Sequence, residues 1–137
     1  MSRSIISGAT YFLTMFVLGF LLGTLRVLLV APRLGEWGAI FVELPIMLGI
    51  SWIVCRWILL RFAVPQRTAQ GLVMGAVAFV LLMIAELLLG TSLFDRTLPQ
   101  QGQAMTSGAG LAGLLGQFAF AVFPLIQVRQ VARQMAA

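Results

Sequence analysis

Histidine and lysine are absent from this chain of 137 residues, and cysteine occurs once, at Cys55. The common zinc, haem and iron–sulfur sites take most of their ligands from histidine and cysteine. We therefore expect no metal site and no cofactor, and a single cysteine excludes a disulfide bond within the chain. The sequence also lacks a nucleophile with a nearby base and a phosphate- or dinucleotide-binding glycine loop. These absences predict that the chain is not an enzyme.

Charged residues are scarce as well: they make up 9% of the chain, whereas hydrophobic residues make up 61%. A water-soluble domain typically contains about 25% charged and about 45–50% apolar residues. With a mean hydropathy of +1.03, the chain has too few polar residues to cover a fold in water. The composition predicts an integral membrane protein.

Four stretches reach the length of about 20 apolar residues that a membrane-spanning helix requires. They lie near residues 9–31, 37–62, 69–94 and 109–128. The first two connections are short and contain Pro or Gly, which favours antiparallel neighbours. The third connection is longer and polar; we expect it to be flexible, and it could fold over one face of the bundle. The predicted fold is all-α: a single domain over residues 1–137, with four transmembrane helices in an antiparallel up-down bundle.

Arginine is distributed unevenly between these connections. Five arginines lie at the chain ends and in the second connection: Arg3, Arg61, Arg67, Arg129 and Arg133. The first and third connections hold one arginine each. Because positive charge in short loops stays on the cytoplasmic side, we expect both termini in the cytoplasm and the chain in a bacterial cytoplasmic (inner) membrane. Basic residues at such helix ends favour anionic headgroups, so the net charge of +5 predicts contact with the lipid bilayer and not with nucleic acid.

Two full charges, Arg26 and Glu43, lie well inside apolar stretches. A turn centred between Leu34 and Gly35 would place Arg26 opposite Glu43 and, near the surface, Arg33 opposite Glu36. One register therefore matches two pairs of opposite charge. We predict an interhelical salt bridge between Arg26 and Glu43 in the outer half of the membrane, and a surface ion pair between Arg33 and Glu36.

The same comparison of depths extends to the other spans. Glu86 falls near the depth of Glu43, and Gln117 falls near the depth of Glu86, so Arg26, Glu43, Glu86 and Gln117 form a predicted buried polar layer with one residue from each helix. One arginine cannot neutralise two carboxylates. Either one carboxyl group is protonated, because desolvation disfavours its charged form, or a cation or a partner completes the charge.

Small residues share helix faces with these polar residues. The first span contains "GFLLG" (residues 19–23) on the face of Arg26, and the third contains "GLVMG" (residues 71–75) on the face of Glu86. Such spacing allows helices to approach closely in lipid. We expect the charged residues to lie on these packing faces, away from lipid.

Pro45 lies two residues beyond Glu43 in the second span. A proline inside a helix removes one backbone donor and leaves the carbonyl four residues earlier without its usual partner. We expect a kink at Pro45. The freed carbonyl could bind a cation or water, or a neighbouring side chain could satisfy it.

Arg56, Arg61 and Arg67 lie near the predicted cytoplasmic end of the second span, with Trp57 between the first two. Arginine that extends towards the interface beside an interfacial tryptophan explains this group. These three arginines are candidate contacts for anionic lipid.

Two functions remain open on the sequence alone. The favoured hypothesis is a non-enzymatic accessory or assembly subunit that packs against other membrane proteins through its glycine-rich faces and its Arg/Glu layer, because the inner half of the spans is almost wholly apolar. The alternative is a small homo-oligomeric transporter or channel, coupled to protons or cations, that uses Glu86 and Glu43. A pocket for a lipid or quinone between the helices is a third hypothesis.

Overall fold

The computed structural model describes residues 1–137, and all of its regular structure is helical. The elements, in chain order, are α1 (Ser2–Leu25), the π-helical turn η1 (Arg26–Val30), α2 (Ala31–Arg61), α3 (Thr68–Ser92), α4 (Leu98–Thr106) and α5 (Gly108–Ala136). Three continuous helical segments are long and apolar enough to cross a membrane: Ser2–Arg61, Thr68–Ser92 and Gly108–Ala136. The all-helical fold class and the apolar membrane-length helices are therefore confirmed.

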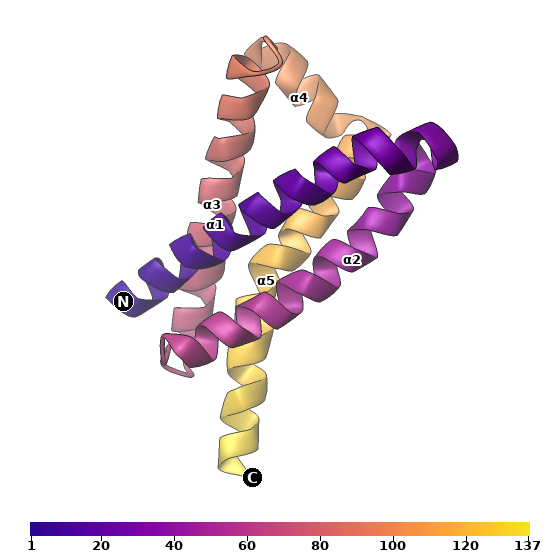
Figure 1. The fold of residues 1–137 in the computed structure, drawn as a ribbon. Coiled ribbons are helices and arrows are strands. Elements are labelled where there is room, and N and C mark those ends of the chain that lie inside the picture. Colours follow the sequence, from indigo (N-terminus) through magenta and orange to yellow (C-terminus); the bar gives the residue numbers. More distant parts are fainter.

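The first of these segments, 60 residues long, folds back on itself. Gly35 has φ 74° and ψ 173°, a conformation that residues with a Cβ rarely adopt. Figure 1 shows α1 and α2 as two arms that run in opposite directions from this point. The predicted turn at Leu34 and Gly35 is thus confirmed. The first span was expected to end near residue 31, whereas helical structure continues on both sides of Gly35. We call residues 2–61 the hairpin.

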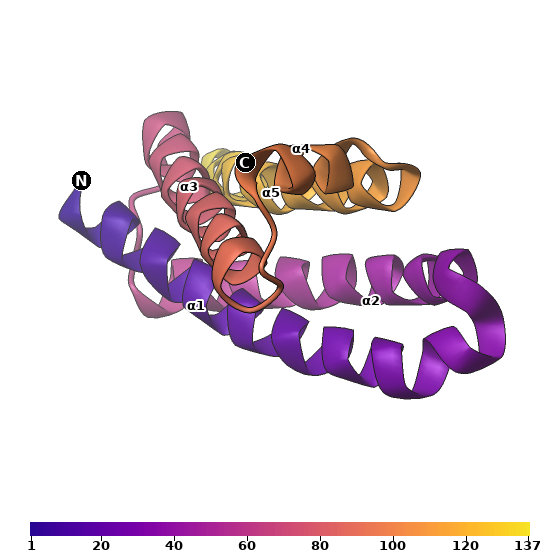
Figure 2. The ribbon, with the colours of Figure 1, turned by 90° about the horizontal axis from the view of Figure 1, so that it is seen from above.

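The hairpin forms one layer of the fold, and α3 and α5 form the second. Between the two layers α1 contacts α3 and α2 contacts α5, and within them α1 contacts α2 and α3 contacts α5. Figure 1 shows the hairpin crossing α3 and α5 obliquely, and Figure 2, seen from above, shows α5 apart from α1 while α3 reaches across to the hairpin. The helices therefore cross at an angle instead of lying side by side as in a simple up-down bundle.

The apolar core lies towards the open end of the hairpin, where both chain termini are found (Figure 1). It combines one aromatic side chain each from α1 and α5 with smaller apolar side chains from α1, α2, α3, α5 and the α2–α3 connection. Its ten buried members are Tyr11, Met15, Cys55, Ile58, Leu59, Val64, Met74, Ala78, Phe120 and Val128. The other half of the molecule, near the hairpin turn, contains no residue of this core.

Glycine allows α3 to approach its neighbours closely. A Cβ on Gly75 would collide with the backbone carbonyl of Ala121 in α5, and a Cβ on Gly71 would lie 2.9 Å from the Pro124 carbonyl oxygen. In the contact between α1 and α3, a Cβ on Gly8 of α1 would lie 2.7 Å from the carbonyl oxygen of Met74 in α3. The "GLVMG" face therefore packs inside the chain, which corrects the expectation that it faces other proteins.

The connection between α3 and α5 is more ordered than the sequence indicated. Residues 98–106 form the helix α4, which begins with a capping box: the Thr97 side chain accepts from the Gln100 backbone N–H, and the Gln100 side chain accepts from the Thr97 N–H. Pro99 occupies the first turn, where its missing N–H costs no hydrogen bond. Most of the connection that was expected to be flexible is therefore helical, because these local signals support a short helix, and α4 packs against α3 and α5.

Candidate functional site

Arg26 and Glu43 form the only ion pair of the chain. The Arg26 Nε lies 3.0 Å from Glu43 Oε2, and the two side chains are 36% and 19% exposed. Arg26 begins the π-helical turn η1, in which the Ala31 N–H donates to the Arg26 carbonyl. Such a turn is wider than an α-helical one and often marks a functional site. The turn at Gly35 then brings α2 back so that Glu43 reaches the arginine.

Glu86 and Gln117 form a second polar contact, between α3 and α5. The Gln117 amide Nε2 donates to Glu86 Oε1. The other amide atom, Gln117 Oε1, is buried and has no hydrogen-bond partner. Glu86 has a neutral partner here, whereas Glu43 has a cationic one.

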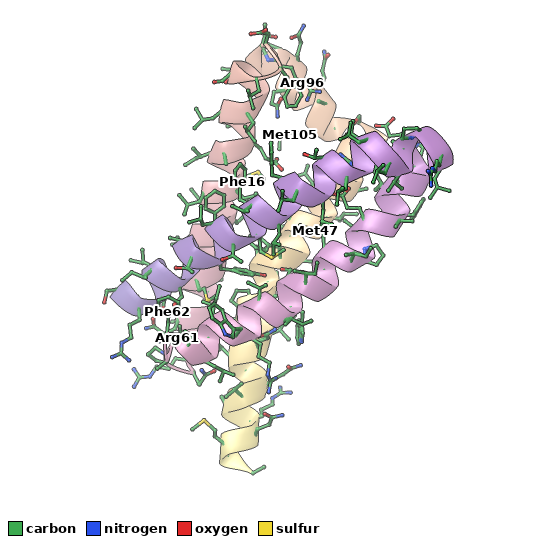
Figure 3. All side chains as sticks on the ribbon, in the orientation of Figure 1. Phe16, Met47, Arg61, Phe62, Arg96 and Met105 are labelled. Carbon is green, nitrogen blue, oxygen red and sulfur yellow. The ribbon has the colours of Figure 1, made fainter.

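All four residues of the predicted polar layer line one cavity of about 380 Å³ between the two layers of helices. We call this the polar cavity. Apolar side chains complete most of its wall, and they include Phe16 and Met47, which Figure 3 labels on α1 and α2. Met15, Ser51 and Phe120 lie at its end nearest the apolar core.

A second cavity of about 490 Å³ shares Arg26, Glu86 and Gln117 with the first and extends beneath α4. Its lining also includes Glu36 and Arg96, which are both exposed. Figure 3 shows Arg96 at the end of the molecule that carries α4, opposite the end with Arg61. The two cavities together connect the polar layer with the exposed surface near α4.

Tyr11 belongs to the apolar core and bonds to Ser51 and Phe120, two residues that line the polar cavity. It is not among the site residues predicted from the sequence. Its hydroxyl contacts the Ser51 hydroxyl and lies 3.2 Å from the Phe120 carbonyl oxygen to which it donates. Its ring stacks on the Phe120 ring with centroids 4.3 Å apart. The signal was available, because Ser4, Ser7 and Tyr11 place small polar groups at successive helical positions on one buried face of α1.

The structure bears on two further features predicted from the sequence, the Arg33–Glu36 ion pair and the kink at Pro45. Arg33 and Glu36 are both exposed and do not form an ion pair, because the positive φ of Gly35 between them redirects the chain. Pro45 lies within α2, and the only residue of that helix with non-helical backbone angles is Gly35. The sharp reversal of this segment is therefore at Gly35, and the kink at Pro45 stays a prediction.

The three candidate lipid-binding arginines, Arg56, Arg61 and Arg67, are exposed at the open end of the hairpin. Figure 3 shows Arg61 on the side of the molecule opposite α4. Their side chains make no salt bridge within the chain, so they are free to contact an external anion.

No protein-family model matches the chain, and no similarity to a curated protein or to a solved structure was found. The class of protein is therefore defined by the fold and the site alone. The chain is all-helical with three apolar segments of membrane-spanning length, which is consistent with an integral membrane protein. Ionisable side chains line a cavity between its helices.

Proposed function

We propose that this protein is a small transporter or channel of a bacterial inner membrane, coupled to protons or cations and working as a homo-oligomer. The observation that carries the proposal is the polar cavity, which gathers Arg26, Glu43, Glu86 and Gln117 from four different parts of the helical fold. Ionisable groups at membrane depth are costly, and they commonly mark ion or proton pathways. The proposed activity is non-enzymatic.

In the proposed topology, α1, α2, α3 and α5 each cross the bilayer, with both termini in the cytoplasm. Arg3, Arg61, Arg67 and the arginines of the α5 end lie towards one side of the fold, with the termini and the α2–α3 connection. The other side carries the hairpin turn and α4. This distribution supports the cytoplasmic assignment, because arginine in short loops is retained on the cytoplasmic side.

The cavity suggests how such a site would work. Glu86 receives a proton or cation that enters beneath α4, through the cavity shared with Arg96. Binding releases the Gln117 amide from its contact with Glu86. Tyr11, held by Ser51 and Phe120, separates this site from the cytoplasmic side, so passage requires these contacts to open.

The accessory-subunit hypothesis also relied on glycine-rich faces that would pack against other membrane proteins, and several of these glycines have their contacts within the chain. Gly71 and Gly75 pack against α5, and Gly19 faces Met47 within the hairpin, where an added Cβ would lie 3.3 Å from the Met47 Cε. These glycine faces support internal packing of the chain. An accessory role therefore remains as the alternative outcome of the functional test.

The test is ion flux into proteoliposomes that contain the purified chain. Glu86→Gln keeps the shape of the side chain and an oxygen that can accept a hydrogen bond, but it removes the negative charge. We expect this variant to lose the proton or cation flux that the native protein shows. Asp95→Asn is the matched control, because Asp95 is exposed in the α3–α4 connection and lines neither cavity. Equal flux in the native protein and in Glu86→Gln would reject the proposal.

The native mass of the gently extracted protein provides a second measurement. A simple multiple of 14.9 kDa is expected for a homo-oligomeric transporter. Other membrane proteins bound in fixed ratio would instead identify the chain as an accessory subunit.

A further inference from the structure

We propose that the polar cavity binds a protonated primary or secondary amine that carries an apolar group. The inference rests on the proposed function and assigns a substrate class to the same site. It follows from three properties of the cavity: its charge, its unsatisfied hydrogen-bonding groups and the side chains of its remaining wall.

The charge of the cavity favours a cation with a single positive charge. Glu43 is paired with Arg26 at 3.0 Å, and this is the only ion pair of the chain. Glu86 has no ion pair, and its one hydrogen bond is with the neutral amide of Gln117. When ionised, Glu86 therefore leaves one negative charge in the cavity that no residue of the chain pairs with, and an unpaired charge away from water is costly.

The hydrogen-bonding groups favour a ligand that donates. A carboxylate accepts hydrogen bonds and cannot donate them, and the Gln117 Oε1 is a buried acceptor without a donor. A primary or secondary ammonium group has at least two N–H donors, so it can serve both acceptors while balancing the charge. A quaternary ammonium group balances the charge but offers no N–H.

A metal cation fits the site less well. Divalent cations of the calcium type take about 6–8 oxygen ligands. No group of three or more His, Cys, Asp or Glu residues that could hold a metal occurs in the chain. The two carboxylates of the cavity belong to different contacts, one with Arg26 and one with Gln117.

The remaining wall suits an apolar body. Phe16, Phe20 and Phe120 line the cavity together with Met47, Leu48 and Leu82. Aromatic faces attract cations as well as apolar groups. The volume of about 380 Å³ lies near the lower end of the range of about 300–1,000 Å³ for small-molecule sites, so the amine should carry a body of one ring or a short alkyl chain.

The experiment measures binding of three matched probes to the full chain in detergent by isothermal titration calorimetry. The probes are phenethylamine, its trimethylammonium analogue and phenethyl alcohol. We expect phenethylamine to bind at least about tenfold more tightly than either analogue, because charge-assisted hydrogen bonds are the stronger ones. Glu86→Gln should lower its affinity by a similar factor, and Asp95→Asn should leave it unchanged.

Gln117→Met supplies the second variant, since it keeps the size of the side chain and removes the unsatisfied acceptor. It should narrow the difference between phenethylamine and the trimethylammonium analogue. Equal affinity of these two probes for the native protein, or amine binding that Glu86→Gln leaves unchanged, would overturn the inference.

The two proposals can fail separately. Glu86-dependent flux of protons or alkali cations without amine selectivity would reject the amine and retain the transporter. Selective amine binding without any Glu86-dependent flux would retain the amine site and reject transport.

Discussion

The hydroxyl of Tyr11 joins three helices at one point: it contacts the Ser51 hydroxyl of α2 and donates to the Phe120 carbonyl of α5. The chain has one tyrosine, and it lies fully buried in the apolar core, bonded to two residues that line the polar cavity. This contact fixes the hairpin layer on the second layer at the level where the cavity ends.

Replacement of Tyr11 by Phe should therefore weaken this junction. The change preserves the ring that stacks on Phe120 but leaves the Ser51 hydroxyl without its tyrosine partner. We expect a loss of about 1–3 kcal/mol in the free energy of unfolding, the usual cost of a buried polar group without a partner. Thermal unfolding in detergent measures it, with Thr24→Val as control, since exposed Thr24 bonds only within its own helix. An unfolding temperature equal to that of the native protein would show that the hydroxyl does not join the layers.

Gly75→Ala should disrupt the contact of α3 with α5. The added Cβ would collide with the Ala121 carbonyl, so the helices must separate or bend, and overpacking of this kind costs about 1–3 kcal/mol. Gly49→Ala is the matched control in α2, because nothing lies within 4 Å of its Cβ position. There the higher helix propensity of alanine should stabilise the protein by up to about 1 kcal/mol. Opposite signs for the two variants are expected in the same unfolding assay, and equal effects would contradict the close α3–α5 approach.

Arg26→Gln should destabilise the protein by leaving Glu43 without its ion pair. Breaking a fully buried pair costs about 3–5 kcal/mol, but the Arg26 side chain is 36% exposed, so solvent screening reduces the expected loss to about 1–2 kcal/mol. Arg33→Gln should change stability by less than about 0.5 kcal/mol, because Arg33 is exposed and unpaired. Denaturant unfolding of both variants tests the difference. A loss of similar size for Arg33→Gln would indicate a general effect of arginine instead of the specific pair.

Gly90→Ala should loosen α4. A Cβ at Gly90 would collide with the side chain of Gln101, which is buried against α3. We expect backbone amides of residues 98–106 to exchange hydrogen at least about tenfold faster, which corresponds to about 1.4 kcal/mol of lost local stability. Gly102→Ala is the control, because its Cβ position is open. Unchanged protection of α4 in Gly90→Ala would show that Gln101 does not hold it in place.

Much of this architecture could be predicted from the sequence. Composition predicts the long apolar helices that the structure shows. The turn at Gly35 sets the level at which Arg26 and Glu43 face each other, because the register of a hairpin follows from its turn. The pairing of Glu86 with Gln117 could also be predicted from depth, even though the length of the connection between their helices left the register loose.

Only the tertiary structure determined which faces of the helices pack against each other. An apolar helix of a membrane protein is hydrophobic on all sides, so its sequence does not distinguish a face towards lipid, a face towards another protein and a face within the chain. The oblique crossing of the layers placed Gly71 and Gly75 against α5 and Tyr11 beneath the cavity. These contacts join residues far apart in the chain, and their geometry depends on the shapes of both partners, which no local pattern contains.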